Sequence, residues 1–236
     1  MTRGTGKYSE LLTVDDNDWN RDFKQAGISD RTILCESCER RFTPYDTHGF
    51  NVITEMMKAK LEYRDSSGKV AYIATTADYT LFKLFVLSIL WRASVSSLEF
   101  FAGIKLGVHE ERVRAMLETN NAESENDYPI LCFYQTGHKY PSTVLQPFRQ
   151  RTNDGINFCR LYLQYNIVFV IKVDSRPLCN ELLPWAVKPL SQVLFAHFPY
   201  LRSYEMEALE STKIRIKKHL GLPLRVTYIS GKASTY

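Results

Sequence analysis

Two cysteines three positions apart, Cys35 and Cys38, are the residues whose types and spacing point most directly to chemistry. Two thiolates on a tight turn can supply half of a tetrahedral zinc site. The chain has no second C-x-x-C pair, and the histidine that follows most closely is His48. The spacing predicts a zinc site with Cys35, Cys38 and His48 as ligands, against the alternatives of an empty turn or a pair of structural thiols. A redox C-x-x-C is disfavoured, because 33–34 is a poor candidate for the strand that such a motif follows.

Basic side chains lie close to this pair in the sequence, and they could contact phosphate groups. They are Arg31, Arg40 and Arg41. A second basic stripe spans residues 213–218, and for both groups a solvated surface is the competing interpretation. Residues 109–111 (His-Glu-Glu) resemble part of a metal motif but lack the second histidine of H-E-x-x-H, so a charged first helical turn is favoured.

Composition sets limits on the class of protein. The chain has 236 residues, of which 44% are hydrophobic, and a net charge of +4 from 30 basic and 26 acidic side chains. This balance permits a nucleic-acid surface without arguing for one. Five cysteines, an odd number, do not form a disulfide framework, and the N-terminus lacks the apolar core of a signal peptide. We expect a cytoplasmic protein in a reducing environment.

The apolar pattern predicts a long buried helix over residues 78–98, with Asp78 as its N-cap. Lys83 and Arg92 interrupt the apolar run, so no membrane span is expected. Further helices are predicted over 44–61, from 107 onwards with Val113 on its buried face, over 190–198 and over 205–220. A helical turn is expected within 19–26.

Alternating apolar residues predict strands elsewhere in the chain. A hairpin is expected within 62–76, an antiparallel meander over 129–135, 155–165 and 167–174, and a closing strand over 224–229. The predicted fold class is α+β, with a helical N-terminal half and a mostly antiparallel sheet with a C-terminal helix in the second half. The expected organisation is a loose arm (1–30), a knuckle and helical region (31–120) and a sheet region (121–236), the last two forming one continuous domain.

Three segments resemble a family of bacterial proteins of largely uncharacterised role that are labelled HNH-endonuclease-like. They are ILCESCERRF, DYTLFKLFVLSILWRASVSS and IKLGVHEERVRAML, and the resemblance covers residues 27–128. Fuller members carry an upstream C-x-x-C and a Ser-His-Ile-Ile-Pro-type segment, which would complete a zinc site and supply a catalytic histidine. The first 34 residues here contain neither cysteine nor histidine. The resemblance therefore implies descent from a nuclease-like or zinc-ribbon fold, while the missing residues argue against nuclease activity.

Three hypotheses follow. The first is a non-catalytic HNH-like protein that binds nucleic acid or a protein partner, within bacterial antiviral defence or a mobile element. The second is a metal-dependent nuclease completed by another subunit, with His48, His109 and His138 as candidate bases or ligands. The third is an interaction protein without a ligand, which would dock through its aromatic-rich β half.

Overall fold

A computed structural model of the chain describes residues 11–14, 19–22, 30–64, 66, 68, 70–135, 146–163, 166–190 and 192–198. The chain divides into two compact units, Met1–Ser29 with Leu201–Tyr236, and Asp30–Tyr200. In the first unit, β1 (Leu11–Val14) pairs antiparallel with β2 (Trp19–Asp22). The prediction of a helical turn within 19–26 is therefore wrong for residues 19–22, which form β2. The predicted helix 205–220 and closing strand 224–229 lie outside the described residues.

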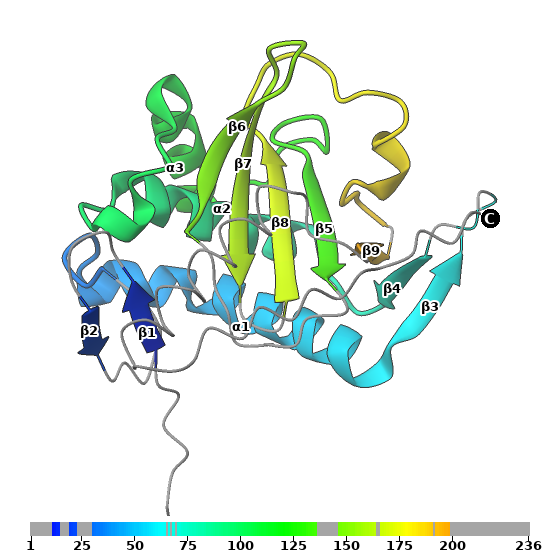
Figure 1. Ribbon diagram of the computed structural model, residues 1–236, viewed down its shortest axis with the longest axis horizontal. Coiled ribbons are helices and arrows are strands. Elements are labelled where there is room, and N and C mark those ends of the chain that lie inside the picture. The colour runs from blue at the N-terminus through cyan, green and yellow to red at the C-terminus, as the bar shows by residue number, and fades with distance from the viewer. Residues whose placement is uncertain are drawn as a thin grey trace, which may run out of the picture. The chain divides into compact units, whose positions relative to one another are not determined.

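The unit Asp30–Tyr200 is built on a seven-stranded sheet with the order β3-β4-β9-β5-β8-β7-β6 (Figure 1). The strands are β3 (Leu61–Arg64), β4 (Val70–Ala74), β5 (Ile130–Gln135), β6 (Phe148–Arg151), β7 (Asn157–Leu163), β8 (Ile167–Lys172) and β9 (Val193–Phe198). Neighbouring strands are antiparallel except β5 and β9, which run parallel. The protein thus combines helices with a mixed sheet, and two of the strands come from the N-terminal half.

The local strand predictions are largely confirmed. β3 and β4 form the expected hairpin, and the strands predicted at 129–135, 155–165 and 167–174 are present as β5, β7 and β8. The predicted meander order is wrong, because β5 pairs with β8 and not with β7. The helix predicted over 190–198 is wrong, because this segment forms β9. Val193 and Phe195 are buried while Leu194 between them is half-buried, which is the two-residue period of a strand. β6 was not predicted.

In the part of the chain that the structure describes, the α-helices beside the sheet are α1 (Glu36–Ala59), α2 (Tyr79–Val95) and α3 (Glu110–Glu118) (Figure 1). Short 3-10 helices are η1 (Glu99–Phe101), η2 (Gly107–His109) and η4 (Leu183–Trp185). The predicted N-cap of α2 is confirmed, since the Asp78 carboxylate accepts the Leu81 amide hydrogen at 2.8 Å. The predicted buried face of α3 is also confirmed, with Val113 fully buried. Within the described chain, no helix combines the length and apolarity needed to cross a membrane.

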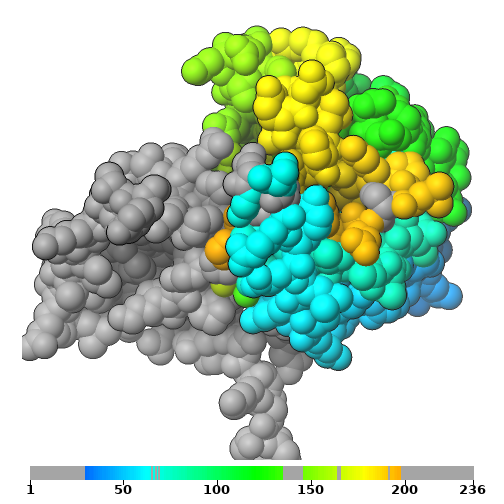
Figure 2. Space-filling view, turned by 90° about the vertical axis from the view of Figure 1, so that its right-hand side faces the viewer, coloured from blue at the N-terminus to red at the C-terminus, as the bar shows by residue number. Residues whose placement is uncertain are grey.

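Helix α2 packs against one face of the sheet. The Phe82 ring meets the rings of Phe169 (β8) and Phe195 (β9) edge-on at 6.0 and 6.3 Å. The opposite sheet face, with Leu131 and Val168, packs against the segment that follows β8. Figure 2 shows this segment, in yellow to orange, beside the cyan β3–β4 hairpin.

Helix α1 packs against α2, and Gly49 of α1 lies directly against the Phe85 ring of α2. A β-carbon at this position would lie 2.2 Å from the Phe85 ring, so only glycine permits the observed contact. Near this contact, Arg92 of α2 forms an ion pair with Asp46 of α1 at 2.7 Å. Helix α1 begins eight residues earlier than the start predicted at Pro44, so Cys35 and Cys38 belong to its N-terminal end.

Candidate functional site

The two cysteines lie together at the exposed N-terminus of α1. Cys35 is the N-cap residue in an extended conformation, and Cys38 lies in the first helical turn. Their Sγ atoms are 3.2 Å apart, and Cys35 Sγ lies 3.0 Å from Ser37 Oγ. Cys35 is exposed and Cys38 half-buried. The spacing of three residues becomes a side-by-side pair because one helical turn separates the two positions.

The segment before the pair is fixed by Asp30. Its carboxylate accepts hydrogen bonds from the Thr32 amide and hydroxyl at 3.0 and 2.6 Å. The other carboxylate oxygen accepts from the Ser96 hydroxyl at 2.8 Å and from the Ser97 amide at 3.2 Å, just beyond the end of α2. These bonds hold the pKa of Asp30 well below its usual range. The entry into α1 is thereby tied to α2.

The pKa values of the two thiols are shifted in opposite directions. Hydrogen bonds from the Ser37 hydroxyl, the Cys38 thiol and the Cys38 amide favour the Cys35 thiolate and lower the pKa of Cys35 to about 7. The pKa of Cys38 is raised, first by its hydrogen bond with Cys35 and then by burial. Near neutral pH Cys35 is therefore the cysteine of the pair that loses its proton first, and about half of the molecules carry it as a thiolate. A thiolate is both the nucleophile and the metal-binding form of cysteine.

The three predicted phosphate-contacting arginines are all exposed around this end of α1. Arg40 forms an ion pair with Glu36 one turn earlier, at 2.9 Å. Arg41 is close enough to Cys38 for its positive charge to lower the pKa of that thiol, against the larger raising effects. Among the described residues, Arg31 makes no ion pair. The three arginines therefore lie near the thiol pair, and the charge of Arg40 is already neutralised by Glu36.

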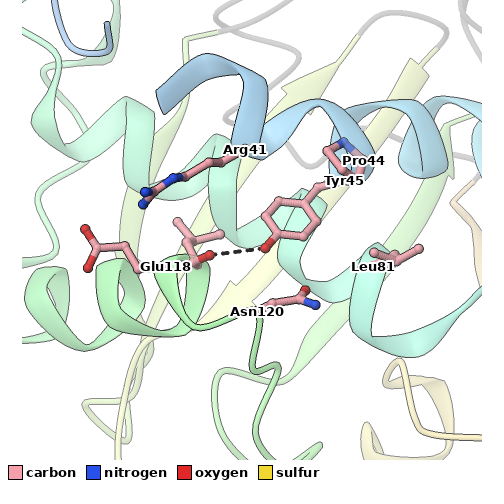
Figure 3. A pocket seen from close by; sticks show the side chains of 7 residues that line it. Arg41, Pro44, Tyr45, Leu81, Glu118 and Asn120 are labelled. Atoms are coloured by element: carbon pink, nitrogen blue, oxygen red, sulfur yellow. Dashed lines mark hydrogen bonds between the residues drawn. The ribbon is translucent and has the colours of Figure 1, made fainter. Parts of the chain in front are cut away.

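A shallow groove of about 350 Å³ begins one helical turn after Cys38 (Figure 3). Its walls come from α1, α2 and the end of α3, and it is lined by Arg41, Pro44, Tyr45, Leu81, Leu117, Glu118 and Asn120. The Tyr45 hydroxyl donates to the Leu117 carbonyl at 3.1 Å, which joins α1 to α3 across the groove. The groove is open to solvent and is lined by both apolar and charged side chains. It therefore suits a side chain of a partner protein better than a small molecule, which usually binds in an enclosed pocket.

His48 does not join the cysteines. It lies ten residues after Cys38 on the same helix, which places it about 15 Å further along the helix axis. Its Nε2 accepts the Asp78 amide hydrogen at 2.9 Å. Ligands of one zinc ion all lie near 2 Å from it, so the predicted set of Cys35, Cys38 and His48 is not brought together. Within the described part of the chain, no three His, Cys, Asp or Glu side chains are grouped as a metal site.

His109 contacts Tyr128 rather than the thiol pair. His109 Nδ1 lies 3.1 Å from the Tyr128 hydroxyl, and burial is the main reason that its pKa is lowered. His138 lies outside the described residues. In the aromatic-rich β half, Tyr134 packs edge-on against Tyr72 at 5.3 Å.

Sequence reasoning missed a buried polar cluster around Lys83 of α2. The Lys83 ammonium donates to the Tyr79 hydroxyl at 3.1 Å and to the Ser124 carbonyl at 2.7 Å. Burial lowers the pKa of Lys83 to about 8. Nearby, Arg112 binds Asp127 at 2.6 Å. The cluster holds the connection after α3 against α2, and the signal for it is a lysine inside an otherwise apolar helix.

Comparison with known proteins gave no match to a family model, to a curated protein or to a solved structure.

Proposed function

We propose that this protein is a non-catalytic binding protein in which Cys35 and Cys38 hold half of a zinc site that another polypeptide completes. The observation that carries the proposal is the pair of thiols 3.2 Å apart at the exposed start of α1. In a tetrahedral site with zinc–sulfur distances of 2.3 Å, two sulfur atoms lie about 3.8 Å apart. A small rotation of the exposed Cys35 side chain would widen the sulfur–sulfur distance from 3.2 Å to that value, an opening of about 0.6 Å.

The acidity of the pair supports the same proposal. Zinc binds thiolates, so each cysteine ligand must lose its proton before or during binding. The lowered pKa of Cys35 reduces the cost of the first proton loss near neutral pH. When bound, the metal would be held by both sulfur atoms, and its charge would favour loss of the second proton from Cys38.

The charges around the pair favour a polypeptide partner over a nucleic acid. Arg31, Arg40 and Arg41 are accompanied by acidic residues, namely Glu36 and Glu39 in the first turn of α1 and Glu118 at the end of α3. Nucleic-acid binding draws its affinity from an excess of positive charge that neutralises phosphates. The mixed surface and the adjoining groove instead suit the mixed side chains of a protein.

The test is zinc binding by tag-free, reduced, full-length protein, measured by titration at equilibrium, because two thiolates of one chain bind zinc only weakly before another polypeptide supplies the remaining ligands. We expect bound zinc in the wild type and none in Cys35→Ser/Cys38→Ser. Cys179→Ser is the matched control, because Cys179 is exposed but lies in another part of the unit. A wild type without zinc, or a double variant that retains it, would contradict the proposal.

Nucleic-acid binding through Arg31, Arg40 and Arg41 is the alternative that the same protein can test. A labelled DNA or RNA fragment whose mobility shifts in low salt, and less so after Arg31→Ala/Arg41→Ala, would favour it. We expect no such dependence on these two arginines.

A further inference from the structure

We propose that the polypeptide that completes this site is a second copy of the same chain. One zinc ion would then be held by four thiolates, Cys35 and Cys38 of each copy. This inference rests on the proposed function, since it identifies the partner at the same site. It also requires that no other cysteine of the chain can act as the third ligand.

The positions of the remaining cysteines meet that requirement. All five cysteines of the sequence lie among the described residues. Cys132 on β5 and Cys159 on β7 are fully buried in the core beneath the helices, and burial raises the pKa of both thiols. Cys179 is exposed in the segment after β8, and within the described chain it forms no metal-ligand group with the pair. A third thiolate must therefore come from a different molecule.

The geometry of the pair suits a twofold arrangement. Two ligands from one helix terminus occupy two corners of a tetrahedron and leave the opposite two corners free. A second copy rotated by 180° about an axis through the metal would place its own pair on those corners. Such a contact uses the same surface on both molecules and closes after two copies, as isologous interfaces do.

The electrostatics of this end of α1 also fit. A zinc ion with four thiolates carries a formal charge of −2. Each copy would direct the positive end of its α1 dipole towards that charge. Each copy also brings the exposed Arg41, about one helical turn after Cys38, and the exposed Arg31. The Arg40–Glu36 ion pair adds no net charge. Because Glu39 and Glu118 also lie near each pair, the surface around it carries charges of both signs, and two copies can approach without strong like-charge repulsion.

The experiment is a zinc titration of tag-free, full-length, metal-free protein under reducing conditions, with mass measured by light scattering during size-exclusion chromatography. We expect a monomer without metal and a dimer once zinc is added. The end point should fall at about 0.5 zinc per chain, and a chelator should restore the monomer. In parallel, alkylation followed by peptide mass spectrometry should show Cys35 and Cys38 of nearly every chain protected at that same end point.

The outcomes separate the two proposals. A monomer that binds one zinc per chain through Cys35 and Cys38 would overturn the second-copy inference and leave the zinc site in place. A dimer that forms equally well without zinc, or in Cys35→Ser/Cys38→Ser, would also overturn the inference. No zinc binding at all would overturn both proposals. Cys179→Ser should behave like the wild type throughout.

Discussion

Replacement of Gly49 by alanine should separate α1 from α2 and destabilise the unit. The new β-carbon would lie 2.2 Å from Cγ and Cδ1 of Phe85 and 2.5 Å from Cε1. Carbon atoms in contact are normally about 3.5–4.0 Å apart, so one of the two groups must move by more than about 1 Å. The Phe85 ring cannot rotate freely, because the rings of Phe82 and Phe169 lie 6.1 Å from it.

The expected magnitude combines two opposing effects. Inserting a methyl group into a well-packed contact costs about 1–3 kcal/mol, and this overlap belongs at the upper end of that range. Alanine in place of glycine inside a helix recovers about 1 kcal/mol. We therefore expect Gly49→Ala to lower the free energy of unfolding by about 2 kcal/mol. Thr47→Ala, at an exposed position of the same helix, is the control for the helix-propensity effect and should change stability little.

The assay is urea denaturation followed by circular dichroism, with Gly49→Ala, Phe85→Leu and the double variant compared in a mutant cycle. Phe85→Leu alone should destabilise the protein by leaving a cavity. In the double variant the smaller side chain makes room for the methyl group, so we expect the two effects to be less than additive by at least about 1 kcal/mol. Gly49→Ala with wild-type stability, or strictly additive effects, would refute the close packing described here.

Three further predictions concern single groups. In metal-free protein, the alkylation rate of Cys35 should rise with pH with a midpoint near 7. Cys38→Ala should move this midpoint to higher pH, because the Cys35 thiolate loses a hydrogen-bond donor. A wild-type midpoint near the ordinary thiol value of 9 would contradict the lowered pKa. The pKa of Lys83 is about 8 in the folded protein and 10.5 in its ordinary state, so the unfolded chain binds more protons between these values and stability should rise with pH across that window. Relative to Lys83→Met, the wild type should gain up to about 3 kcal/mol in urea denaturation between pH 8 and 10.5, and parallel pH profiles would exclude a depressed pKa. Asp78→Ala should cost about 1 kcal/mol of stability through loss of the α2 N-cap, whereas Asp78→Asn should be nearly neutral; equal losses would show that the cap bond is unimportant.

Sequence reasoning succeeded where the signal was local. Asp78 marks the start of α2 because an N-cap acts on amides two or three residues away. The turn within 62–76 predicts the β3–β4 hairpin for the same reason. In contrast, β9 gains its strand conformation from pairing with β4 on one side and β5 on the other, both remote in sequence. Its apolar run alone fits a helix or a strand equally well.

The candidate site shows the same division. The spacing of Cys35 and Cys38 correctly placed two thiols together, because three residues span about one helical turn. His48 was assigned to them as the histidine that follows most closely in the sequence, with the helix expected to begin only at Pro44. The chain instead continues as a helix through Pro44, a residue that usually starts a helix and seldom lies inside one. Residues ten positions apart in a helix are separated by about 15 Å along its axis, so His48 cannot share a metal ion with Cys35 and Cys38.

The measurement that tests the account most directly is the X-ray absorption spectrum of zinc in tag-free, reduced, full-length protein. The account predicts a zinc ion with a first shell of four sulfur atoms at about 2.3 Å, which is lost in Cys35→Ser/Cys38→Ser. A first shell of nitrogen and oxygen atoms, or the absence of bound zinc, would contradict it.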